Sequence, residues 1–468
     1  MKREASNFLQ NWLESTPFKP LVMRGARQVG KTWLVRHLAE INNKQLIELN
    51  FEKSPEYQQY FKSNDPRMVL RYLEAALDTN IDPQKCVLFL DEIQGAPELI
   101  SKLRWFGEDL PQLPVIAAGS LLEFSLANYP YSMPVGRIGY LHIEPLTFQE
   151  FLCALGKDKL CDFIKTVAFH DVEASFNPLH EQLMTLFKDY LIIGGMPEAV
   201  ASWVLHGSLE RVGHIHYNLL ATYRDDFSKY AGFLNTSRLE DVLMSIPKLV
   251  GKKFTYSHVN REVQSAPLKQ ALELLIKAKL CSKVSACSAN GIPIGAELKS
   301  NHFKVILLDV GLLNSLSGLR LHQLMNSQDI LLVNHGAIAE QVTGQLLRAI
   351  DPPYMEPQLY YWIREENRSS AEVDYVIQQQ VNRIPIEVKA GSTGHLRSLH
   401  VFMALKKLPL AVRINADLPS IVDIDTKTAV NKTAKYKLIS LPVYLVGQLN
   451  RLLSDCDCDT STAAPLGF

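Results

Sequence analysis

The stretch Arg24-Gly25-Ala-Arg-Gln-Val-Gly30-Lys31-Thr32 decides how this chain begins to fold. It fits the pattern G-x-x-x-x-G-K-[S/T], and it lies between an apolar run at 20–24 and a helical pattern at 32–41. Its glycines let the backbone curl so that several N–H groups face one anion, and the helix dipole adds positive charge. The stretch therefore predicts an ATP-binding phosphate loop between a strand and a helix. The loop residues expected to hold the nucleotide are Gly25, Ala26, Arg27, Gln28, Val29, Gly30, Lys31 and Thr32.

A second apolar run, Cys86-Val-Leu-Phe-Leu-Asp91-Glu92, ends in two carboxylates about sixty residues later. In such sites the loop lysine reaches the β- and γ-phosphates, and the hydroxyl beside it binds Mg²⁺. We expect Lys31 and Thr32 to take these roles, and Asp91 to hold the same ion through its water shell. Glu92 is then the residue that polarises the attacking water. A carboxylate at this position favours hydrolysis over switch-like binding.

Two further residues are candidates for the same site. Ser120 follows the apolar run Val115–Ala118, which is expected to lie beside the Asp91 strand; it either senses the γ-phosphate or caps a helix. Arg137 precedes the run Ile138–Ile143. An arginine at that place in an AAA-type sheet reaches the nucleotide of a neighbouring subunit, which makes a homo-oligomer an expected partner state. A surface arginine, or one acting within its own chain, is the alternative.

Composition excludes several classes of protein. The 468 residues are 47% hydrophobic and 21% charged, which is ordinary for globular domains and argues against disordered, collagen-like and coiled-coil chains. Lysine and arginine balance aspartate and glutamate at 49 each, so a wholly basic nucleic-acid coat protein is excluded. Seven scattered cysteines, no signal-peptide pattern and no long uncharged apolar run predict a cytoplasmic protein without a membrane partner.

A second cluster of ionisable residues lies in the C-terminal third, in Glu372-Val-Asp374-Tyr-Val-Ile and Ile386-Glu387-Val-Lys389. Asp374 and Glu387 on neighbouring strands can share a Mg²⁺ ion, and Lys389 projects from the same strand face as Glu387. Glu340 completes the expected metal set, because Gly336 and Gly344 flank it on one helical stripe and would let its helix approach the sheet. Asp374, Glu387 and Lys389 are thus candidate catalytic residues. The alternative is a buried ion network in a docking domain.

The whole chain resembles a widespread prokaryotic family of AAA-type ATPases that carry a C-terminal domain of unknown function. The matching stretches include RGARQVGKT at 24–32, FLDEIQ at 89–94, YLIIGGMPEAV at 190–200, LLDVGLL at 307–313 and IEVKAG at 386–391. The C-terminal stretches also resemble the PD-(D/E)xK core of Holliday-junction-resolvase-like nucleases. The resemblance implies ATP binding and hydrolysis, and it implies no particular substrate.

The expected fold class is α/β, with a P-loop AAA-type parallel sheet, a helical lid, a winged-helix-like middle segment and a PD-(D/E)xK nuclease-like domain. The middle segment carries about five more basic than acidic residues, among them Lys252, Lys253, Lys269 and Lys283, which are interpreted either as a phosphate-facing patch or as a solvated helix face. The expected segments are 1–146 (ATPase core), 147–235 (lid), 236–300 (winged-helix-like), 301–450 (nuclease-like) and 451–468 (flexible tail).

The expected function is Mg²⁺-dependent ATP binding and hydrolysis, with a nuclease-like domain acting on DNA. The alternative is an ATPase switch whose C-terminal domain docks a protein partner or a nucleic acid without cutting it.

Overall fold

The computed structural model describes residues 1–127, 136–169, 176–230, 232, 234–319, 335–366, 369–389, 396–428 and 431–460. Two compact units divide the chain. The first comprises 1–145 with 273–280 and 352–356, and the second comprises 146–272, 281–351 and 357–468. Among the described helices, none combines the length and the apolar character that a bilayer-crossing segment needs.

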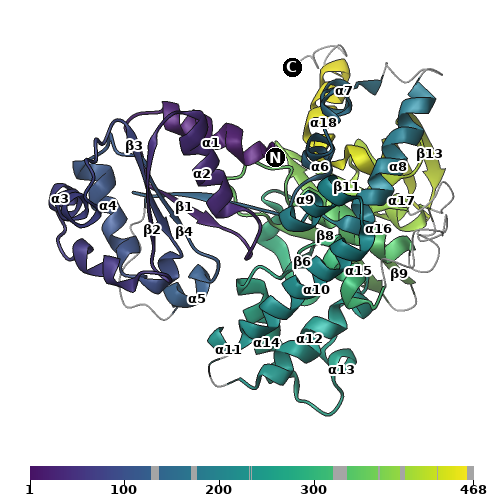
Figure 1. Ribbon diagram of the computed structural model, residues 1–468. Helices are drawn as coiled ribbons and strands as arrows, with labels where there is room; N and C mark the ends of the chain where they lie inside the picture. The colour runs from purple at the N-terminus through teal and green to yellow at the C-terminus, as the bar shows by residue number, and fades with distance from the viewer. Residues whose placement is uncertain are drawn as a thin grey trace, which may run out of the picture. The chain divides into compact units, whose positions relative to one another are not determined.

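The first unit is built on a five-stranded parallel sheet in the order β2-β3-β4-β1-β5. Its strands are β1 Leu21–Arg24, β2 Gln45–Asn50, β3 Cys86–Asp91, β4 Val115–Ala118 and β5 Gly139–His142. Every residue of β3 and β4 is buried, because helices cover both faces of the sheet. Figure 1 shows α1 and α2 on one face and α3 and α4 on the other. The parallel α/β sheet predicted for the N-terminal region is confirmed.

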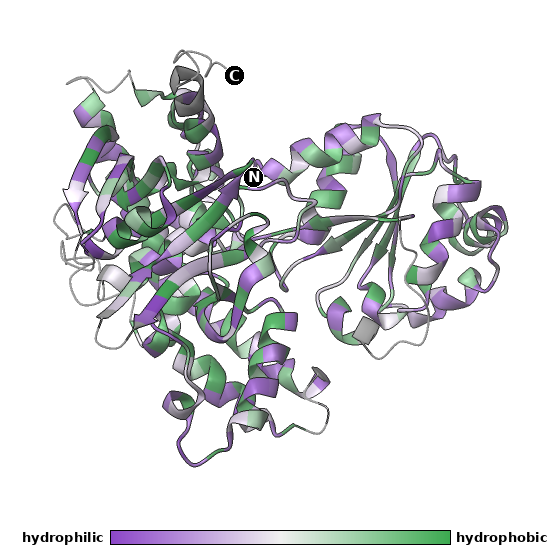
Figure 2. Cartoon of the chain, turned by 180° about the vertical axis from the view of Figure 1, so that it is seen from behind, coloured by the Kyte–Doolittle hydropathy of each residue, from purple (hydrophilic) through white to green (hydrophobic). Residues whose placement is uncertain are grey.

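Helix α3 of this unit begins at a side-chain cap. Asp65 accepts a hydrogen bond from the Arg67 N–H and caps α3, whose first residue is a proline. Figure 2 shows hydrophobic strands between helices that each carry polar and apolar faces. The helical segments are α1 Glu4–Glu14, α2 Lys31–Ile41, η1 Pro55–Phe61, α3 Pro66–Leu77, η2 Ile93–Gly95, α4 Leu99–Asp109 and α5 Leu122–Ala127.

The second unit opens with helices over the range expected for a lid, and they belong to the same compact unit as the C-terminal sheets. Thr147 and Glu150 form a reciprocal capping box at the start of the first of them. They are α6 Phe148–Ala154, α7 Asp158–Thr166, α8 Asn177–Ile193, α9 Pro197–His206, α10 Leu209–Asp225 and α11 Phe227–Tyr230. The segment expected to be winged-helix-like follows with α12 Thr236–Leu249, α13 Tyr256–Val259 and α14 Ser265–Lys277, and the division between the units falls within α14.

Two sheets complete the second unit. One is mixed, in the order β7-β6-β8-β9, and the other has the order β10-β11-β12-β14-β13 with parallel central strands. The elements are β6 Cys281–Cys287, η5 Ile294–Glu297, β7 Leu298–Leu307, α15 Val310–Leu316, α16 His335–Leu347, β8 Leu359–Glu366, β9 Ser369–Val373, β10 Tyr375–Gln379, β11 Asn382–Val388, α17 Arg397–Lys406, β12 Leu410–Asn415, β13 Ser420–Lys427, β14 Thr433–Pro442, η7 Val443–Gln448 and α18 Leu449–Thr460.

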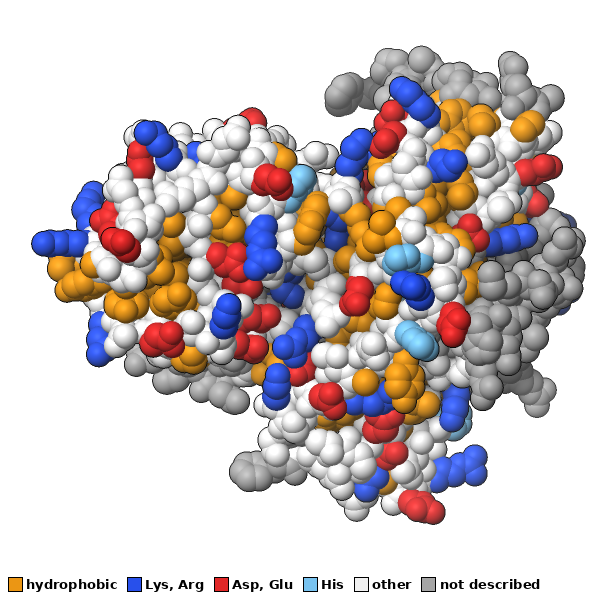
Figure 3. All heavy atoms as spheres, in the orientation of Figure 1, with side chains coloured by type: hydrophobic (Ala, Val, Ile, Leu, Met, Phe, Trp, Pro, Cys, Tyr) orange, Lys and Arg blue, Asp and Glu red, His pale blue; other side chains and the backbone are white. Residues whose placement is uncertain are grey.

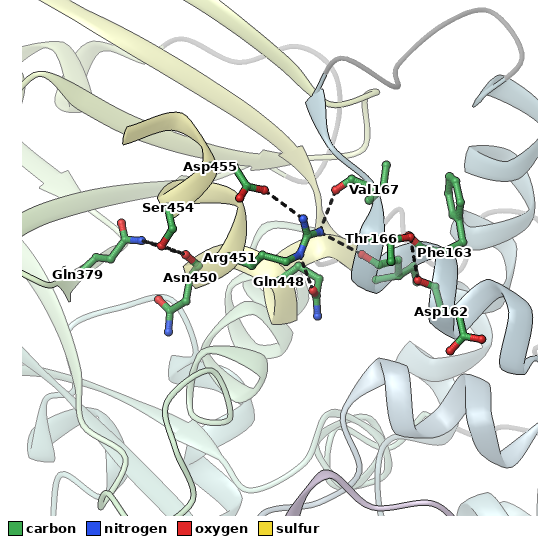
Figure 4. Close-up of polar contacts among 11 residues, drawn as sticks. Asp162, Phe163, Thr166, Val167, Gln379, Gln448, Asn450, Arg451, Ser454 and Asp455 are labelled. Carbon is green, nitrogen blue, oxygen red and sulfur yellow. Dashed lines mark hydrogen bonds and ion pairs between the residues drawn. The ribbon is translucent and has the colours of Figure 1, made fainter. Parts of the chain in front are cut away.

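Two expected boundaries differ from the structure. The helices and the β6–β7 hairpin follow the winged-helix order, but β7 crosses the boundary at residue 300 and β6 continues into a sheet with β8. The expected flexible tail begins as a helix, α18, because its polar side chains are held. Arg451 donates to the Val167 carbonyl at 2.8 Å, and the amide of Gln379 donates to the Ser454 hydroxyl at 3.1 Å (Figure 4).

Candidate functional site

The phosphate loop connects β1 to α2 in the conformation that its glycines allow. Gly30 caps α2 with φ 95°, and Gln28 also has a positive φ of 64°. A Cβ on Gly25 would collide with the Ile143 carbonyl oxygen, so only glycine fits there. Arg3 holds the loop from outside, donating from Nη1 to the Val29 carbonyl at 2.9 Å and from Nη2 to the Glu144 carbonyl at 2.7 Å. The role of this arginine, the N-cap of α1, was not anticipated from the sequence.

Lys31 is the electrostatic centre of the loop. Its ammonium folds back and donates to the carbonyl oxygens of Gly25 at 3.0 Å and Ala26 at 2.7 Å. Burial lowers the pKa of Lys31 to about 8, although the charges of Glu92 and Asp91 act in the opposite direction. Because these partners are neutral carbonyls, the lysine has no counter-ion in direct contact among the described residues. An anion in the loop would supply one.

The magnesium candidates lie together at the carboxyl edge of the sheet. The Thr32 hydroxyl lies 3.4 and 3.3 Å from the two Asp91 carboxylate oxygens, and the amide of Asn50 donates to Asp91 at 3.3 Å. Burial, followed by the charge of Glu92, raises the pKa of Asp91. A hydroxyl and a carboxylate are the hard oxygen ligands that Mg²⁺ prefers, so these residues fit the ion. The sequence analysis did not identify Asn50 as part of this site. Its position at the end of a predicted strand next to the Asp91 strand could have indicated it.

Glu92 follows β3 in a left-handed backbone conformation, with φ 49°. Its carboxylate accepts a hydrogen bond of 2.6 Å from the Gln94 amide, which also donates to Glu52 at 3.1 Å. Arg27 of the loop lies 3.8 Å from Glu52. This chain of contacts ties the candidate base to the phosphate loop through side chains that the sequence pattern did not single out.

Ser120 and Arg137 lie at opposite edges of the sheet. Ser120 follows β4 at the carboxyl edge, and β4 pairs with β3, as predicted, and also with β1. Its hydroxyl is buried and has no hydrogen-bond partner among the described residues. Arg137 precedes β5 at the amino edge, and its Nε lies 3.0 Å from Glu108 of α4. This placement does not support the alternative in which Arg137 acts on a nucleotide bound at Lys31 of its own chain. A role in a neighbouring subunit stays a prediction.

The acid cluster of the second unit assembles from four elements around a lysine that the sequence analysis did not name. Lys304 of β7 is 1% exposed. Its ammonium lies 2.7 Å from Glu340 of α16, 2.5 Å from Glu372 of β9 and 3.8 Å from Asp374. Asp374, which was expected on a strand, stands between β9 and β10, and these two strands belong to different sheets. A lysine inside the apolar run from 303 to 308 was the available signal.

Glu387 and Lys389 lie at the end of β11, next to Asp374. Lys389 donates to Glu387 at 2.7 Å, and the Val388 N–H donates to Asp374 at 2.8 Å. The second carboxylate oxygen of Glu387 is buried and has no hydrogen-bond partner in the described structure. The structure thus brings together all four residues predicted for this site: Glu340, Asp374, Glu387 and Lys389.

Burial and neighbouring charges shift the pKa values of the ionisable groups in this cluster. Burial raises the pKa of Glu340 to about 7, against the attraction of Lys304. Burial and the charge of Asp374 likewise raise the pKa of Glu387 to about 7. Burial lowers the pKa of Lys304, but Glu340, Asp374 and Glu372 outweigh it and hold that pKa above its usual range. Lys304 is therefore charged at every ordinary pH.

The cluster does not form a simple metal site in the described structure. Among the described residues, no group of three His, Cys, Asp or Glu side chains is placed to hold a metal ion. Glu340 and Asp374 contact the Lys304 ammonium, whereas Glu387 retains an unpartnered oxygen that a cation could use. The assignment of Glu340, Asp374 and Glu387 as metal ligands remains a prediction.

The two glycines expected to flank Glu340 differ. A Cβ on Gly344 would collide with the Tyr375 hydroxyl and lie 2.9 Å from Cδ1 of Ile306, so α16 approaches the sheet closely there. A Cβ on Gly336 would meet nothing within 4 Å. Gly251, which was not anticipated, approaches Glu340 instead, because its Cβ would lie 2.9 Å from Oε2.

The basic middle segment is only partly free for a ligand. Lys252 and Lys269 are exposed. Lys253 lies 3.8 Å from Glu365, and Lys283 lies 5.1 Å from the centre of the Phe303 ring. On the face shown in Figure 3, acidic and basic side chains alternate, without a broad patch of one sign. The arrangement fits a solvated face better than a nucleic-acid track.

Comparison with known families divides the chain in three. Residues 17–152 match an AAA domain. Residues 184–323 match a domain of unknown function, DUF8612, and residues 335–443 match another, DUF4143. No curated protein sequence matches the chain.

Solved structures give remote likenesses. A Walker-type ATPase of Pyrococcus abyssi is 16% identical, with 68% of this chain and 95% of that chain covered and a TM-score of 0.42. The Holliday junction branch migration motor RuvB of Thermotoga maritima is 16% identical, with 60% and 89% covered and a TM-score of 0.27. The ORC2 protein of Aeropyrum pernix is 12% identical, with 69% and 93% covered and a TM-score of 0.32.

Proposed function

We propose that this protein hydrolyses ATP in its N-terminal unit, which is a P-loop domain of the AAA type. One observation carries the proposal: Lys31, Thr32 and Asp91 lie together, and the buried ammonium of Lys31 donates to neutral carbonyl oxygens of its own loop. Such a cation is poised to turn toward phosphate oxygens. The loop N–H groups and the start of α2 add to the same attraction.

The residues divide the work by their chemistry. Lys31 offsets the charge that develops on the β- and γ-phosphates, while Thr32 and Asp91 hold Mg²⁺. When bound, the ion would offset part of the negative charge of the phosphates. Glu92 orients the attacking water and takes its proton, and Gln94 positions the Glu92 carboxylate through the bond of 2.6 Å. Ser120, whose buried hydroxyl has no hydrogen-bond partner in the described structure, is available to sense the γ-phosphate.

Two substitutions test hydrolysis directly. Glu92→Gln should retain ATP binding and lower the hydrolysis rate by about a hundredfold or more, because a positioned base contributes that much. Lys31→Ala should bind ATP about a hundredfold more weakly and should lose hydrolysis. Phosphate release that is unchanged in both variants would show that the measured activity does not come from this site.

The acid cluster supports two functions for the second unit. The convergence of Asp374, Glu387 and Lys389 on one strand end favours a metal-dependent nuclease acting on DNA. The placement of Lys304 favours the alternative, a domain that docks a protein or a nucleic acid, because its ammonium already occupies the space between Glu340, Glu372 and Asp374 where a metal ion would bind. We favour the docking function on that observation.

A cleavage panel separates these functions. Purified protein would be incubated with Mg²⁺ or Mn²⁺ and with linear, single-stranded or branched DNA, in the absence and presence of ATP. Cleavage that disappears in Asp374→Ala would establish the nuclease. Docking predicts intact DNA in every condition, together with ATP hydrolysis that is unaffected by Asp374→Ala.

A further inference from the structure

A polar hollow of about 410 Å³ opens in the second unit, away from the acid cluster. Its wall comes from the loop after β6, the start of β7, the end of β8 and the end of α17. The residues that matter are Ser288, Asn290, Lys299, Arg364, Glu365 and Lys406.

The hollow lies at the end of β8 and is lined by none of the acid-cluster residues, and its Trp362 and Arg364 lie on the strand face opposite to that cluster. Successive strand residues point to opposite faces. The ring of Tyr361 lies 5.1 Å from the Lys304 ammonium, whereas the next residue, Trp362, packs on Phe402 of α17 with ring centres 5.0 Å apart. Trp362 and Arg364 therefore share the α17 face. A ligand in the hollow would not enter the acid cluster.

Several lysine and arginine side chains lie at this hollow, and most of their described hydrogen-bond partners are uncharged oxygen atoms. Lys299 donates to the Ile363 carbonyl at 2.7 Å, and Lys406 donates to the Asn290 side-chain oxygen at 2.5 Å. Arg383, beside the hollow, donates to the carbonyls of Ala289 and Asn290 at 2.9 and 2.5 Å. These bonds fix the positions of the cationic groups without cancelling their charge, and each ammonium keeps further N–H donors.

The nearby acids are engaged with other groups. Glu297 accepts a hydrogen bond of 2.8 Å from the Asn290 amide, and Glu365 lies 3.8 Å from both Lys253 and His302. Among the side chains that the structure describes here, Lys299, Arg364, Arg383 and Lys406 stand against these two acids, a formal surplus of two positive charges. Burial lowers the pKa of Lys406, and the charges of Arg383 and Lys299 lower it further while Glu297 opposes them. The cations thus repel one another in the absence of an anion.

We propose that this hollow is a phosphate-binding site, in which Lys299, Arg364 and Lys406 contact the oxygens of a nucleic-acid backbone or of a free polyphosphate. Both sources offer the same chemistry, a dense row of phosphoryl oxygens that match ammonium and guanidinium donors. The volume admits several phosphate oxygens at once, and the Asn290 and Ser288 side chains add neutral polar groups. The site is independent of the ATPase proposal.

Binding by the full-length chain tests the proposal, in a Lys31→Ala background so that the phosphate loop does not contribute. One arm follows the fluorescence anisotropy of a labelled 20-nucleotide single-stranded DNA. The other titrates inorganic tripolyphosphate by calorimetry. The test variant carries Lys299→Gln, Arg364→Gln and Lys406→Gln. The matched control carries Lys432→Gln, Lys435→Gln and Lys437→Gln, which removes three exposed charges from β14 and the residue before it.

We expect the hollow variant to weaken one ligand by about tenfold or more at low salt and the β14 variant to change it by less than about threefold. Each cation that no longer neutralises a phosphate of single-stranded DNA should reduce the slope of log affinity against log salt by about 0.7. Loss of DNA binding identifies the backbone as the ligand, and selective loss of tripolyphosphate binding identifies a free polyphosphate. Equal effects of the two variants, or none, would overturn the proposal.

Circular dichroism checks that each variant is folded. If the triple variant unfolds, Lys406→Gln alone replaces it, because this change removes only one hydrogen bond to an exposed asparagine.

Discussion

Two buried lysines in this chain lie near carboxylates, but they differ in their direct partners and in the direction of their pKa shifts. Lys31 of the first unit donates to carbonyl oxygens, and burial lowers its pKa to about 8. Lys304 of the second unit contacts Glu340 and Glu372 directly, and its pKa is held above the usual range despite burial. Lys31 has no counter-ion in direct contact among the described residues, whereas Lys304 contacts its counter-ions directly.

This difference separates a binding site from a structural network. A desolvated cation without a direct counter-ion is costly in the free protein, and a ligand that supplies the charge is bound more tightly as a result. A cation surrounded by acids contributes to the fold itself, since removing it leaves buried charges of one sign. Substitution of Lys31 should therefore change the affinity for ATP, whereas substitution of Lys304 should change the stability of the fold.

The largest effect is expected for Lys304→Met. Loss of the ammonium leaves Glu340, Glu372 and Asp374 without their partner, and breaking a buried pair in this way costs about 3–5 kcal/mol. The matched control is Lys389→Met, which removes a partly exposed lysine bound to Glu387 and should cost about 1 kcal/mol. Hydrogen exchange of β7 and α16 measures the loss locally.

Charge removal on both sides sharpens this prediction. Lys304→Met combined with Glu340→Gln should recover part of the lost stability, because the second change removes one of the uncompensated carboxylates. If Lys304→Met and Lys389→Met have the same small effect, the three acids do not depend on Lys304 and the contrast with Lys31 fails.

For Lys31→Ala the expected change is in affinity. ATP binding should weaken by about a hundredfold, the scale seen when a preorganised charged donor is removed from a phosphate or oxyanion site. The free energy of unfolding should stay the same or rise, because a buried cation without a direct counter-ion is removed. Lys19→Ala, an exposed lysine before β1, serves as the control and should leave binding unchanged. Calorimetric titration and thermal unfolding of the same samples provide both readouts. A large loss of stability with ATP binding retained would contradict the prediction.

The sequence predicts the phosphate loop more completely than it predicts the acid cluster. The phosphate loop is local: its strand, glycines and helix are consecutive, so spacing alone located Lys31 and Thr32, and the apolar run that ends in two carboxylates marked Asp91. The acid cluster is not local, and its members were found only because strand periodicity marked Asp374 and Glu387. Lys304 was missed and Glu372 was given no role, since their contacts depend on how β7, β9 and α16 come together in the fold, which no spacing rule encodes. The division of the strand at Asp374 was missed for the same reason.

Gly344→Ala tests how closely α16 must approach the sheet around Lys304. The added methyl group would collide with the Tyr375 hydroxyl, which itself donates to the Glu340 carbonyl, so we expect a loss of about 1–3 kcal/mol. Gly336→Ala lies in the same helix with open space around it and should be neutral or stabilising by up to about 1 kcal/mol. Urea unfolding of both variants measures the difference. Similar stability of the two would mean that the helix can shift away without loss, and that Glu340 is not held in place by close packing.

The smallest effect is a pH dependence that only Lys31 should show. The protonated ammonium binds phosphate, and its pKa in the free protein is lowered to about 8, so ATP affinity should fall by about tenfold per pH unit above 8. The phosphate contributes little to this slope, since phosphoryl groups lose their last proton near about pH 6. In Lys31→Arg the guanidinium keeps its charge, and affinity should stay level up to about pH 9.5. Lys304 does not titrate in this range, because its pKa is raised. Titrations of wild type and Lys31→Arg from about pH 7 to 9.5 compare the slopes directly, and a wild-type affinity that stays level would mean that Lys31 has a counter-ion in the free protein, as Lys304 does.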